Sequence, residues 1–312
     1  MALLHAEVDS LSLIQTTKFP TINVPVIDLS KPNSKTLINA WEDFGIVKVI
    51  NHGVRKEVMT KLESEALDFF SLSVTEKESV SDYTSRKIGP NGDAGWVEHL
   101  MSCTLSCDFL QKFPSDLRPT VGDYVFSVRN LAIEVLQLLA EGLEMEEKNV
   151  FSKYLIDDNN DTIFRINHYP LHSDVPEGHS LLGFGEHTDP QIISIIGSND
   201  VEGFQISLND GSWGSVSSDP ESFYIIVDDL LEVITNGRFK SLSHRTLANG
   251  SKDRLSMIYF GGPPLTADIS PLISIMEDGE ESKYKEFTWE EYKKAAFKSK
   301  LTTHRLGAFE IE

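Results

Sequence analysis

The chain has 312 residues, a formal net charge of −20 at pH 7 and two cysteines. This acidic balance argues against a nucleic-acid-binding protein or one that sits on an anionic membrane, because both need a basic face. No stretch reaches the ~20 apolar residues that span a bilayer, and residues 1–20 lack the basic start and apolar middle of a signal peptide. Few cysteines fit a reducing compartment, so we predict a cytoplasmic protein with no membrane partner.

Helical patterns dominate the first half of the chain. Strands are predicted over 24–29 and 46–50. Helices are predicted over 35–44, 56–70 and 120–145. The last of these helices carries one long apolar stripe, so we expect it to back a sheet. The turn residues Pro, Asn, Gly and Asp over 85–96 predict a loop.

Short strands separated by turns dominate the second half. The predicted strands cover 162–169, 181–187, 191–196, 203–208, 223–227, 239–244 and 254–260. A closing helix is predicted over 289–300. Regular short strands are typical of a sandwich or barrel, so we predict an α+β fold with a jelly-roll core, a double-stranded β-helix. The predicted regions are a mainly helical 1–158 and a jelly-roll 159–312.

Three residues form a candidate metal site. Side chains alternate between the faces of an extended strand, so His187 and Asp189 point the same way, and His244 is far enough along the chain to return beside them. Two histidines and one carboxylate make the facial triad of non-haem Fe(II) oxygenases, with coordination positions left open. A His-x-Asp pair by itself is also common at a polar strand end. If His187 is not a ligand, His168 or His179 is the next candidate.

A candidate carboxylate-binding pair follows soon after His244. Arg254 and Ser256 share one face of the last predicted strand. A guanidinium grips a carboxylate with two parallel hydrogen bonds, and a neighbouring hydroxyl can donate a third. The pair is therefore suited to the far end of a dicarboxylate whose near end chelates the iron.

This combination of His187-x-Asp189, His244 and Arg254-x-Ser256 resembles the Fe(II)/2-oxoglutarate-dependent dioxygenases of plants. Longer stretches resemble the gibberellin 2-oxidases within that group. They cover 88–96, 183–191, 235–241, 254–263 and 284–289, and the likeness extends over about 24–306.

The resemblance implies an enzyme that uses Fe(II), 2-oxoglutarate and O2. His187, Asp189 and His244 would be the metal ligands and catalytic residues. The cosubstrate would meet Arg254, Ser256 and Tyr169, although Tyr169 could equally be a buried strand aromatic. The substrate implied is a C19 gibberellin, a small carboxylic acid, hydroxylated at C2 with succinate and CO2 as coproducts, which inactivates the hormone.

Two other interpretations stay open. A related dioxygenase could act on another gibberellin position or another acidic small molecule. A catalytically weak paralogue could bind a ligand without turnover. The sequence does not indicate an oligomeric state.

Four positions depart from the family pattern. Asp228 replaces a usual glycine, which is expected to strain a turn, and Gly214 replaces a β-branched residue, which is expected to loosen a strand. The resemblance places Lys87 and Phe297 at the substrate. Lys87 stands where an arginine is usual and Phe297 where a tyrosine is usual, so weaker binding of the gibberellin carboxylate is expected.

Overall fold

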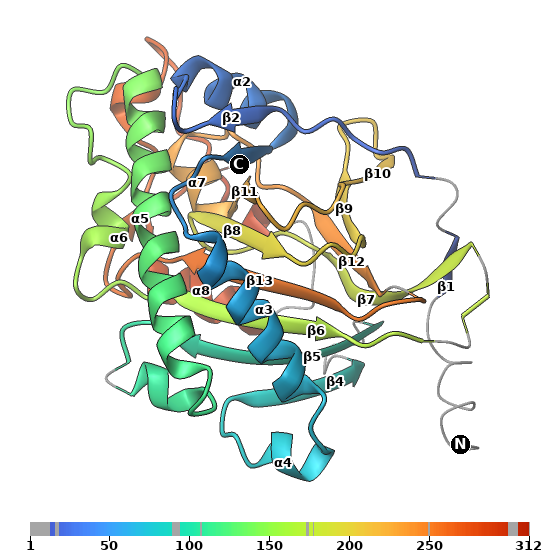
Figure 1. Cartoon of the computed structure of the whole chain (residues 1–312). Helices are drawn as coiled ribbons and strands as arrows, with labels where there is room; N and C mark the ends of the chain where they lie inside the picture. The colour runs from blue at the N-terminus through green and yellow to red at the C-terminus, as the bar shows by residue number, and fades with distance from the viewer. Residues whose placement is uncertain are drawn as a thin grey trace.

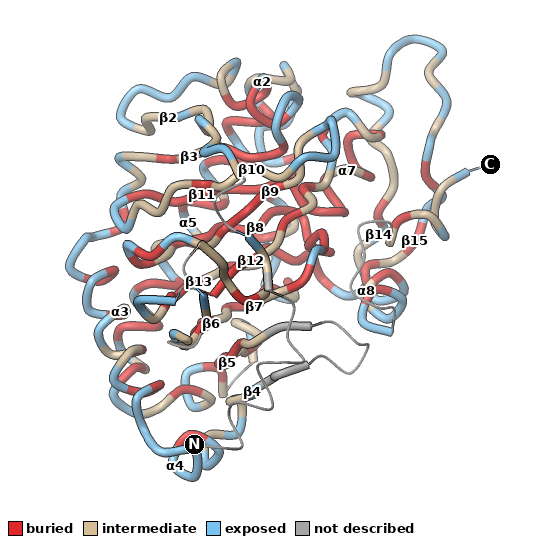
Figure 2. The backbone as a smooth tube through the Cα atoms, turned by 90° about the vertical axis from the view of Figure 1, so that its right-hand side faces the viewer, coloured by how far each residue is buried: buried red, intermediate tan, exposed pale blue. Residues whose placement is uncertain are grey.

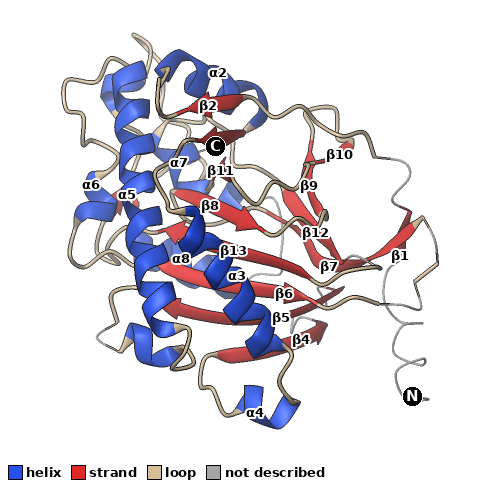
Figure 3. Cartoon of the chain, viewed as in Figure 1, coloured by secondary structure: helices blue, strands red, loops and turns tan. Residues whose placement is uncertain are grey.

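Two β-sheets pack face to face in the computed structural model of the chain, and helices cover the outer face of one of them (Figure 1). The structure describes residues 13–15, 19–88, 94–106, 108–172, 175–176, 178–248, 250–298 and 305–311. The predicted α+β jelly roll is confirmed: two mainly antiparallel sheets curl toward each other, and the helices lie outside them (Figure 3).

The larger sheet has eight strands and the smaller has five. In spatial order the larger contains β2 (Val26–Asp28), β3 (Ile46–Ile50), β11 (Phe223–Val227), β8 (Ile193–Ser198), β13 (Arg254–Gly261), β6 (Ile163–Tyr169), β5 (Ala94–Cys103) and β4 (Tyr83–Ile88). The smaller contains β1 (Leu13–Gln15), β7 (His179–His187), β12 (His244–Ala248), β9 (Phe204–Ser207) and β10 (Trp213–Ser215). A separate pair joins β14 (Asp268–Ile269) to β15 (Phe287–Thr288).

The α-helices lie mainly along the outer face of the larger sheet. They are α2 (Ser34–Phe44), α3 (Lys56–Phe70), α4 (Val74–Glu78), α5 (Arg118–Gly142), α6 (Lys153–Ile156), α7 (Asp229–Ile234) and α8 (Trp289–Lys298). Short 3₁₀ turns cover Phe109–Lys112, Ile273–Ile275 and Arg305–Phe309. Among the described helices, none combines the length and apolarity needed to cross a membrane.

The long helix α5 backs the sheet, as its apolar stripe predicts. Val128, Leu131 and Val135 are at most 1% exposed, and the same hydrophobic cluster includes residues of β6, β8 and β13. Figure 2 shows that the central strands β8 and β11 of this sheet consist mainly of buried residues, drawn in red. Full burial of one Val or Leu side chain contributes about 1.5–3 kcal/mol, so this stripe anchors the sheet that carries part of the site.

The larger sheet crosses the predicted region boundary at residue 158. It takes β2 to β5 from the N-terminal part and β6, β8, β11 and β13 from the C-terminal part. The division at 158 stays a prediction.

Two predicted segments differ from the structure. The segment 85–96 falls largely in the paired strands β4 and β5 rather than in a loop, although the turn residues 89–93 lie outside the described residues. The strand predicted over 239–244 instead begins at His244, because the backbone before it is held by other contacts: the Ser241 N–H donates to the Glu232 carboxylate at 2.7 Å.

The structure contradicts the strain expected at Asp228 and shows which neighbour the glycine at 214 accommodates. Asp228 has φ −108° and ψ 173°, an extended conformation that any residue adopts, so no strain arises there. Gly214 lies in β10, where an added Cβ would sit 2.2 Å from Cγ1 of Ile22. Glycine therefore makes room for Ile22, and the strand pairs normally with β9.

Candidate metal centre

Strand pairing brings two histidines together. β7 ends at His187 and β12 begins at His244, and the two residues are direct partners in the antiparallel register. Both are buried, and their ring centroids lie 4.3 Å apart. The distant His244 therefore arrives beside His187 through the hydrogen-bonded ladder of the smaller sheet.

The hydrogen bonds of each ring fix which nitrogen is available. Nδ1 of His187 lies 2.8 Å from the Gly185 carbonyl, and Nδ1 of His244 lies 3.0 Å from the Leu242 carbonyl. A carbonyl oxygen only accepts, so each Nδ1 carries the hydrogen and donates it. The lone pair is then on Nε2 of each ring, the form in which histidine binds a metal.

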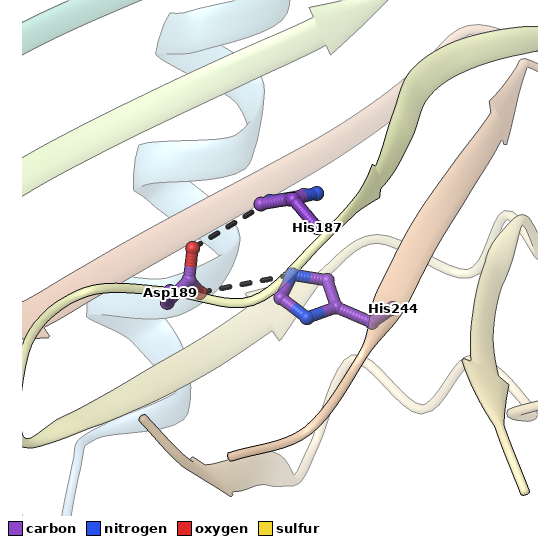
Figure 4. Close-up of side chains that lie close together, drawn as sticks. All are labelled: His187, Asp189 and His244. Atoms are coloured by element: carbon purple, nitrogen blue, oxygen red, sulfur yellow. Dashed lines mark ion pairs between the residues drawn. The ribbon is translucent and has the colours of Figure 1, made fainter. Parts of the chain in front are cut away.

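Asp189 completes the cluster just beyond the end of β7. Its Oδ1 lies 3.5 Å from His187 Nε2 and its Oδ2 lies 3.7 Å from His244 Nε2 (Figure 4). One ligand atom from each of the three residues lies within 4.8 Å of the others. The backbone is fixed as well, because the N–H of Asp229 at the start of α7 donates to the Asp189 carbonyl at 2.9 Å. The spacing suits one shared metal ion.

Burial and mutual contact set the charge of the cluster. Burial, assisted by the neighbouring His187, lowers the pKa of His244 to about 4. Burial would raise the pKa of Asp189, but the two histidines and the Ser194 hydroxyl outweigh it, and the pKa is lowered. At neutral pH His244 is therefore neutral and Asp189 ionised, the states in which both groups ligate a divalent metal.

A second carboxyl group lies behind Asp189. Ser194 Oγ is 3.0 Å from Asp189 Oδ2 and 2.7 Å from Asp228 Oδ2. Ser194 and Asp228 are both fully buried. Burial, followed by the negative charge of Asp189, raises the pKa of Asp228 well above its usual value. Sequence reasoning missed Ser194, whose only signal is a polar residue between two isoleucines of an apolar strand.

The candidate carboxylate-binding residues lie on neighbouring strands of the larger sheet. In the register of β13 with β6, Arg254 is the partner of Tyr169 and Ser256 is the partner of Asn167. The Arg254 guanidinium lies 5.3 Å from the Tyr169 ring centroid, and Asn167 Nδ2 donates to Ser256 Oγ at 3.3 Å. The structure thus places Tyr169, Arg254 and Ser256 together.

The Arg254 guanidinium has hydrogen-bond donors available for an acidic ligand. Arg254 is 2% exposed, and its Nε and Nη1 have no hydrogen-bond partner among the described residues. An unpaired buried charge is costly, so this cation fits a ligand carboxylate. Two glycines leave space for these side chains, Gly203 for Arg254 and Gly183 for Tyr169. A Cβ on Gly203 would lie 3.0 Å from Arg254 Cδ, and one on Gly183 would lie 2.6 Å from Tyr169 Cδ1.

A further cation beside the metal cluster was not predicted. Arg165 lies on β6, on the face it shares with Asn167 and Tyr169 by alternation. Its guanidinium is 5.1 Å from the Phe184 ring, which in turn lies 4.6 Å from the His187 ring. The signal that could have identified it is the period of two along the strand that ends at Tyr169.

Of the two predicted substrate contacts, the structure describes the side chain of Phe297 but not that of Lys87. Lys87 lies in β4, where its pairing with β5 is irregular, and its side chain is outside the described residues. Phe297 lies on α8 with 58% of its side-chain surface exposed. This helix is tied to the metal region, because the Tyr292 hydroxyl donates to Asp229 Oδ2 at 2.6 Å.

Family models match both parts of the chain. Residues 160–263 match the 2OG-Fe(II) oxygenase superfamily, and residues 24–98 match the N-terminal region described as non-haem dioxygenase in morphine synthesis. The first match contains all six predicted metal and cosubstrate residues.

Curated relatives and solved structures agree with these matches. The chain is 53% identical to gibberellin 2-beta-dioxygenase 1 of Pisum sativum, with 92% of this chain and 91% of the relative covered. It is 50% identical to gibberellin 2-beta-dioxygenase of Phaseolus coccineus, with 92% and 91% covered. The fold matches a crystal structure of JOX2 in complex with 2OG, Fe and JA, with a TM-score of 0.85 at 22% identity over 99% of this chain and 97% of the other. It also matches a dioxygenase for auxin oxidation from rice, with a TM-score of 0.77 at 20% identity over 93% of this chain and all of the other.

The chain shares extended identity with the Pisum sativum and Phaseolus coccineus enzymes, matches both family models and carries a buried His–Asp–His cluster, and it therefore belongs to the gibberellin 2-beta-dioxygenase family of 2-oxoglutarate- and Fe(II)-dependent oxygenases.

Proposed function

We propose that this protein is a gibberellin 2-oxidase that hydroxylates C19 gibberellins at C2, with 2-oxoglutarate and O2 consumed and succinate and CO2 released. The observation that carries the proposal is the buried cluster of His187, Asp189 and His244, whose ligand atoms suit one metal ion. The buried guanidinium of Arg254, with donors that have no partner among the described residues, supports it. The relatives at 50% and 53% identity, named gibberellin 2-beta-dioxygenases, indicate the substrate class.

We propose that Nε2 of His187, Nε2 of His244 and a carboxylate oxygen of Asp189 hold Fe(II). The donor set fits, since both Nδ1 atoms are committed to backbone carbonyls and the three residues are at most 9% exposed. When bound, the iron supplies the activation of O2 that attack on an unactivated C–H bond requires. The chain supplies orientation and a site shielded from bulk water.

We propose that Arg254 binds the far carboxylate of 2-oxoglutarate, with Ser256 and Tyr169 beside it. The unpartnered Nε and Nη1 of Arg254 show that the guanidinium keeps donors for a ligand, and a carboxylate is the acceptor that a guanidinium binds most strongly. The Ser256 hydroxyl can donate a third bond because it already accepts from Asn167. Tyr169 also packs its ring against Gly183 of β7, which links the cosubstrate residues to the strand that carries His187.

The proposal also names residues that would contact the gibberellin. A gibberellin carries a carboxylate, and Arg165 places a guanidinium next to Phe184, which touches His187. We propose Arg165, Lys87 and Phe297 as residues that face this substrate. The jelly-roll region 159–312 carries every proposed metal and cosubstrate ligand, and region 1–158 supplies Lys87 on β4. We also propose that the protein acts in the cytoplasm, which a fluorescent fusion can test.

The test is anaerobic reconstitution with Fe(II), followed by air, 2-oxoglutarate and a C19 gibberellin, with succinate and product mass measured together. Succinate with a product heavier by one oxygen atom at C2 is the expected result. His187→Ala should lose bound iron and turnover, whereas His179→Ala on the same strand should keep both. Normal iron content in His187→Ala would contradict the metal assignment. Succinate without hydroxylated gibberellin would point to a different acid, and no succinate with iron bound would point to a ligand-binding paralogue.

A further inference from the structure

The Ser194 hydroxyl joins two carboxyl groups that lie on different segments. Ser194 is on β8, Asp189 follows β7 and Asp228 follows β11. Strand pairing fixes this arrangement, because Ser194 is the partner of Ile226 in the β8–β11 register. The Asp228 N–H also donates to the Ile192 carbonyl at 3.3 Å. The backbone of Asp228 is therefore fixed beside Ser194, and Oδ2 is the side-chain oxygen that contacts Ser194, whereas Oδ1 has no hydrogen-bond partner among the described residues.

A count of hydrogens assigns the donors. Ser194 Oγ lies 3.0 Å from Asp189 Oδ2 and 2.7 Å from Asp228 Oδ2, yet a hydroxyl has one hydrogen to donate. The other contact needs a hydrogen from a carboxyl group. Asp189 is ionised when it ligates a metal, so the hydrogen belongs to Asp228. Asp228 then donates to Ser194, and Ser194 donates to Asp189.

We propose that Asp228 is a positioning residue that acts through Ser194 to orient the Asp189 carboxylate and strengthen the binding of the divalent metal. The proposal rests on the proposed metal site. With Oδ2 of Asp189 engaged by Ser194, Oδ1 is the oxygen left for the metal. A ligand held in one orientation loses less freedom on binding, and partners of this kind are typically worth 10–100-fold in metal affinity.

An ionised Asp228 would act differently. Its negative charge would attract the metal directly, and that effect would vanish in an uncharged isostere. A hydrogen-bond donor at the same place acts through geometry, so an amide can replace the acid. The two variants Asp228→Asn and Asp228→Gly therefore separate the roles. Asn keeps a donor of similar shape, while Gly removes it. The backbone at φ −108° accepts either residue.

The experiment measures the dissociation constant of Mn(II) by electron paramagnetic resonance, on the metal-free full chain without 2-oxoglutarate or gibberellin. We expect Asp228→Asn to stay within about twofold of wild type. Asp228→Gly and Ser194→Ala should bind Mn(II) about tenfold more weakly, at the low end of the range for such partners. The absorption spectrum of bound Co(II) should be unchanged in Asp228→Asn and altered in the other two.

Two results would overturn the inference. One is equal weakening in Asp228→Asn and Asp228→Gly, which would assign the effect to charge. The other is wild-type affinity in Asp228→Gly or, if that variant does not fold, in Ser194→Ala. Failure of the proposed function is distinguishable, because wild type would then bind no Mn(II) at the cluster or bind it equally well after His187→Ala.

Discussion

Replacement of Arg254 by methionine should weaken 2-oxoglutarate binding and raise the stability of the ligand-free protein. Methionine keeps much of the length and the apolar stem but removes the guanidinium. In the wild type that group is 2% exposed, and two of its nitrogens have no partner among the described residues. A buried charge without a partner is destabilising, so Arg254→Met should raise Tm when no cosubstrate is present.

The loss in binding follows from the donors removed. Two hydrogen bonds to a charged group are worth about 1.5–3 kcal/mol each, so at least about 3 kcal/mol is lost. This corresponds to a rise of about a hundredfold or more in the Kd for 2-oxoglutarate. The wild type should gain about 2.7 kcal/mol of stability at a cosubstrate concentration of 100 Kd, and the variant should gain almost none at that concentration.

The assay is titration calorimetry of the Mn(II)-loaded protein with 2-oxoglutarate, with thermal unfolding recorded with and without the ligand. Arg238→Met is a matched control, because Arg238 is 41% exposed and pairs with Glu42 on the surface. The control should bind 2-oxoglutarate normally and change stability by less than about 1 kcal/mol. A Kd for Arg254→Met within ~3-fold of the wild-type value would refute the role assigned to Arg254.

Four further outcomes are expected. Phe297→Tyr should lower the KM for gibberellin by up to about one to two decades, since one hydrogen bond to a charged group is worth about 1.5–3 kcal/mol; an unchanged KM would remove Phe297 from the pocket. Arg165→Leu should raise the same KM while the KM for 2-oxoglutarate stays constant, and equal changes in both would argue against a substrate contact. The pKa of His244 is lowered to about 4 in the folded chain, so the unfolded chain binds more protons between pH 4 and 6.5. The stability that this group contributes is therefore lost as the pH falls through that window. In denaturant titrations of the metal-free protein, His244→Gln should lose about 3 kcal/mol less stability over this window than wild type. Gly214→Val should destabilise the protein by about 1–3 kcal/mol through overlap with Ile22, and Ile22→Ala should rescue it in the double variant; additive losses would contradict that contact.

The sequence by itself determined the local elements and the chemistry of the site. The helix α3 and the strands β3 and β11 have the predicted bounds, because α3 carries apolar residues at helical spacing and the two strands are short apolar runs with turn residues beside them. The pairs His187-x-Asp189 and Arg254-x-Ser256 indicated metal and carboxylate binding from residue type and alternation alone. These signals lie within a few residues of one another, where local geometry fixes which side chains share a face.

The tertiary structure decided what depends on contacts between distant segments. Only the register of β7 with β12 shows that His244 meets His187, and only the packing of three segments shows that Ser194 joins Asp228 to Asp189. The strain expected at Asp228 was wrong for the same reason. Backbone angles and free space at a residue are set by its neighbours in the fold, such as Ile22 beside Gly214, and no local pattern contains them.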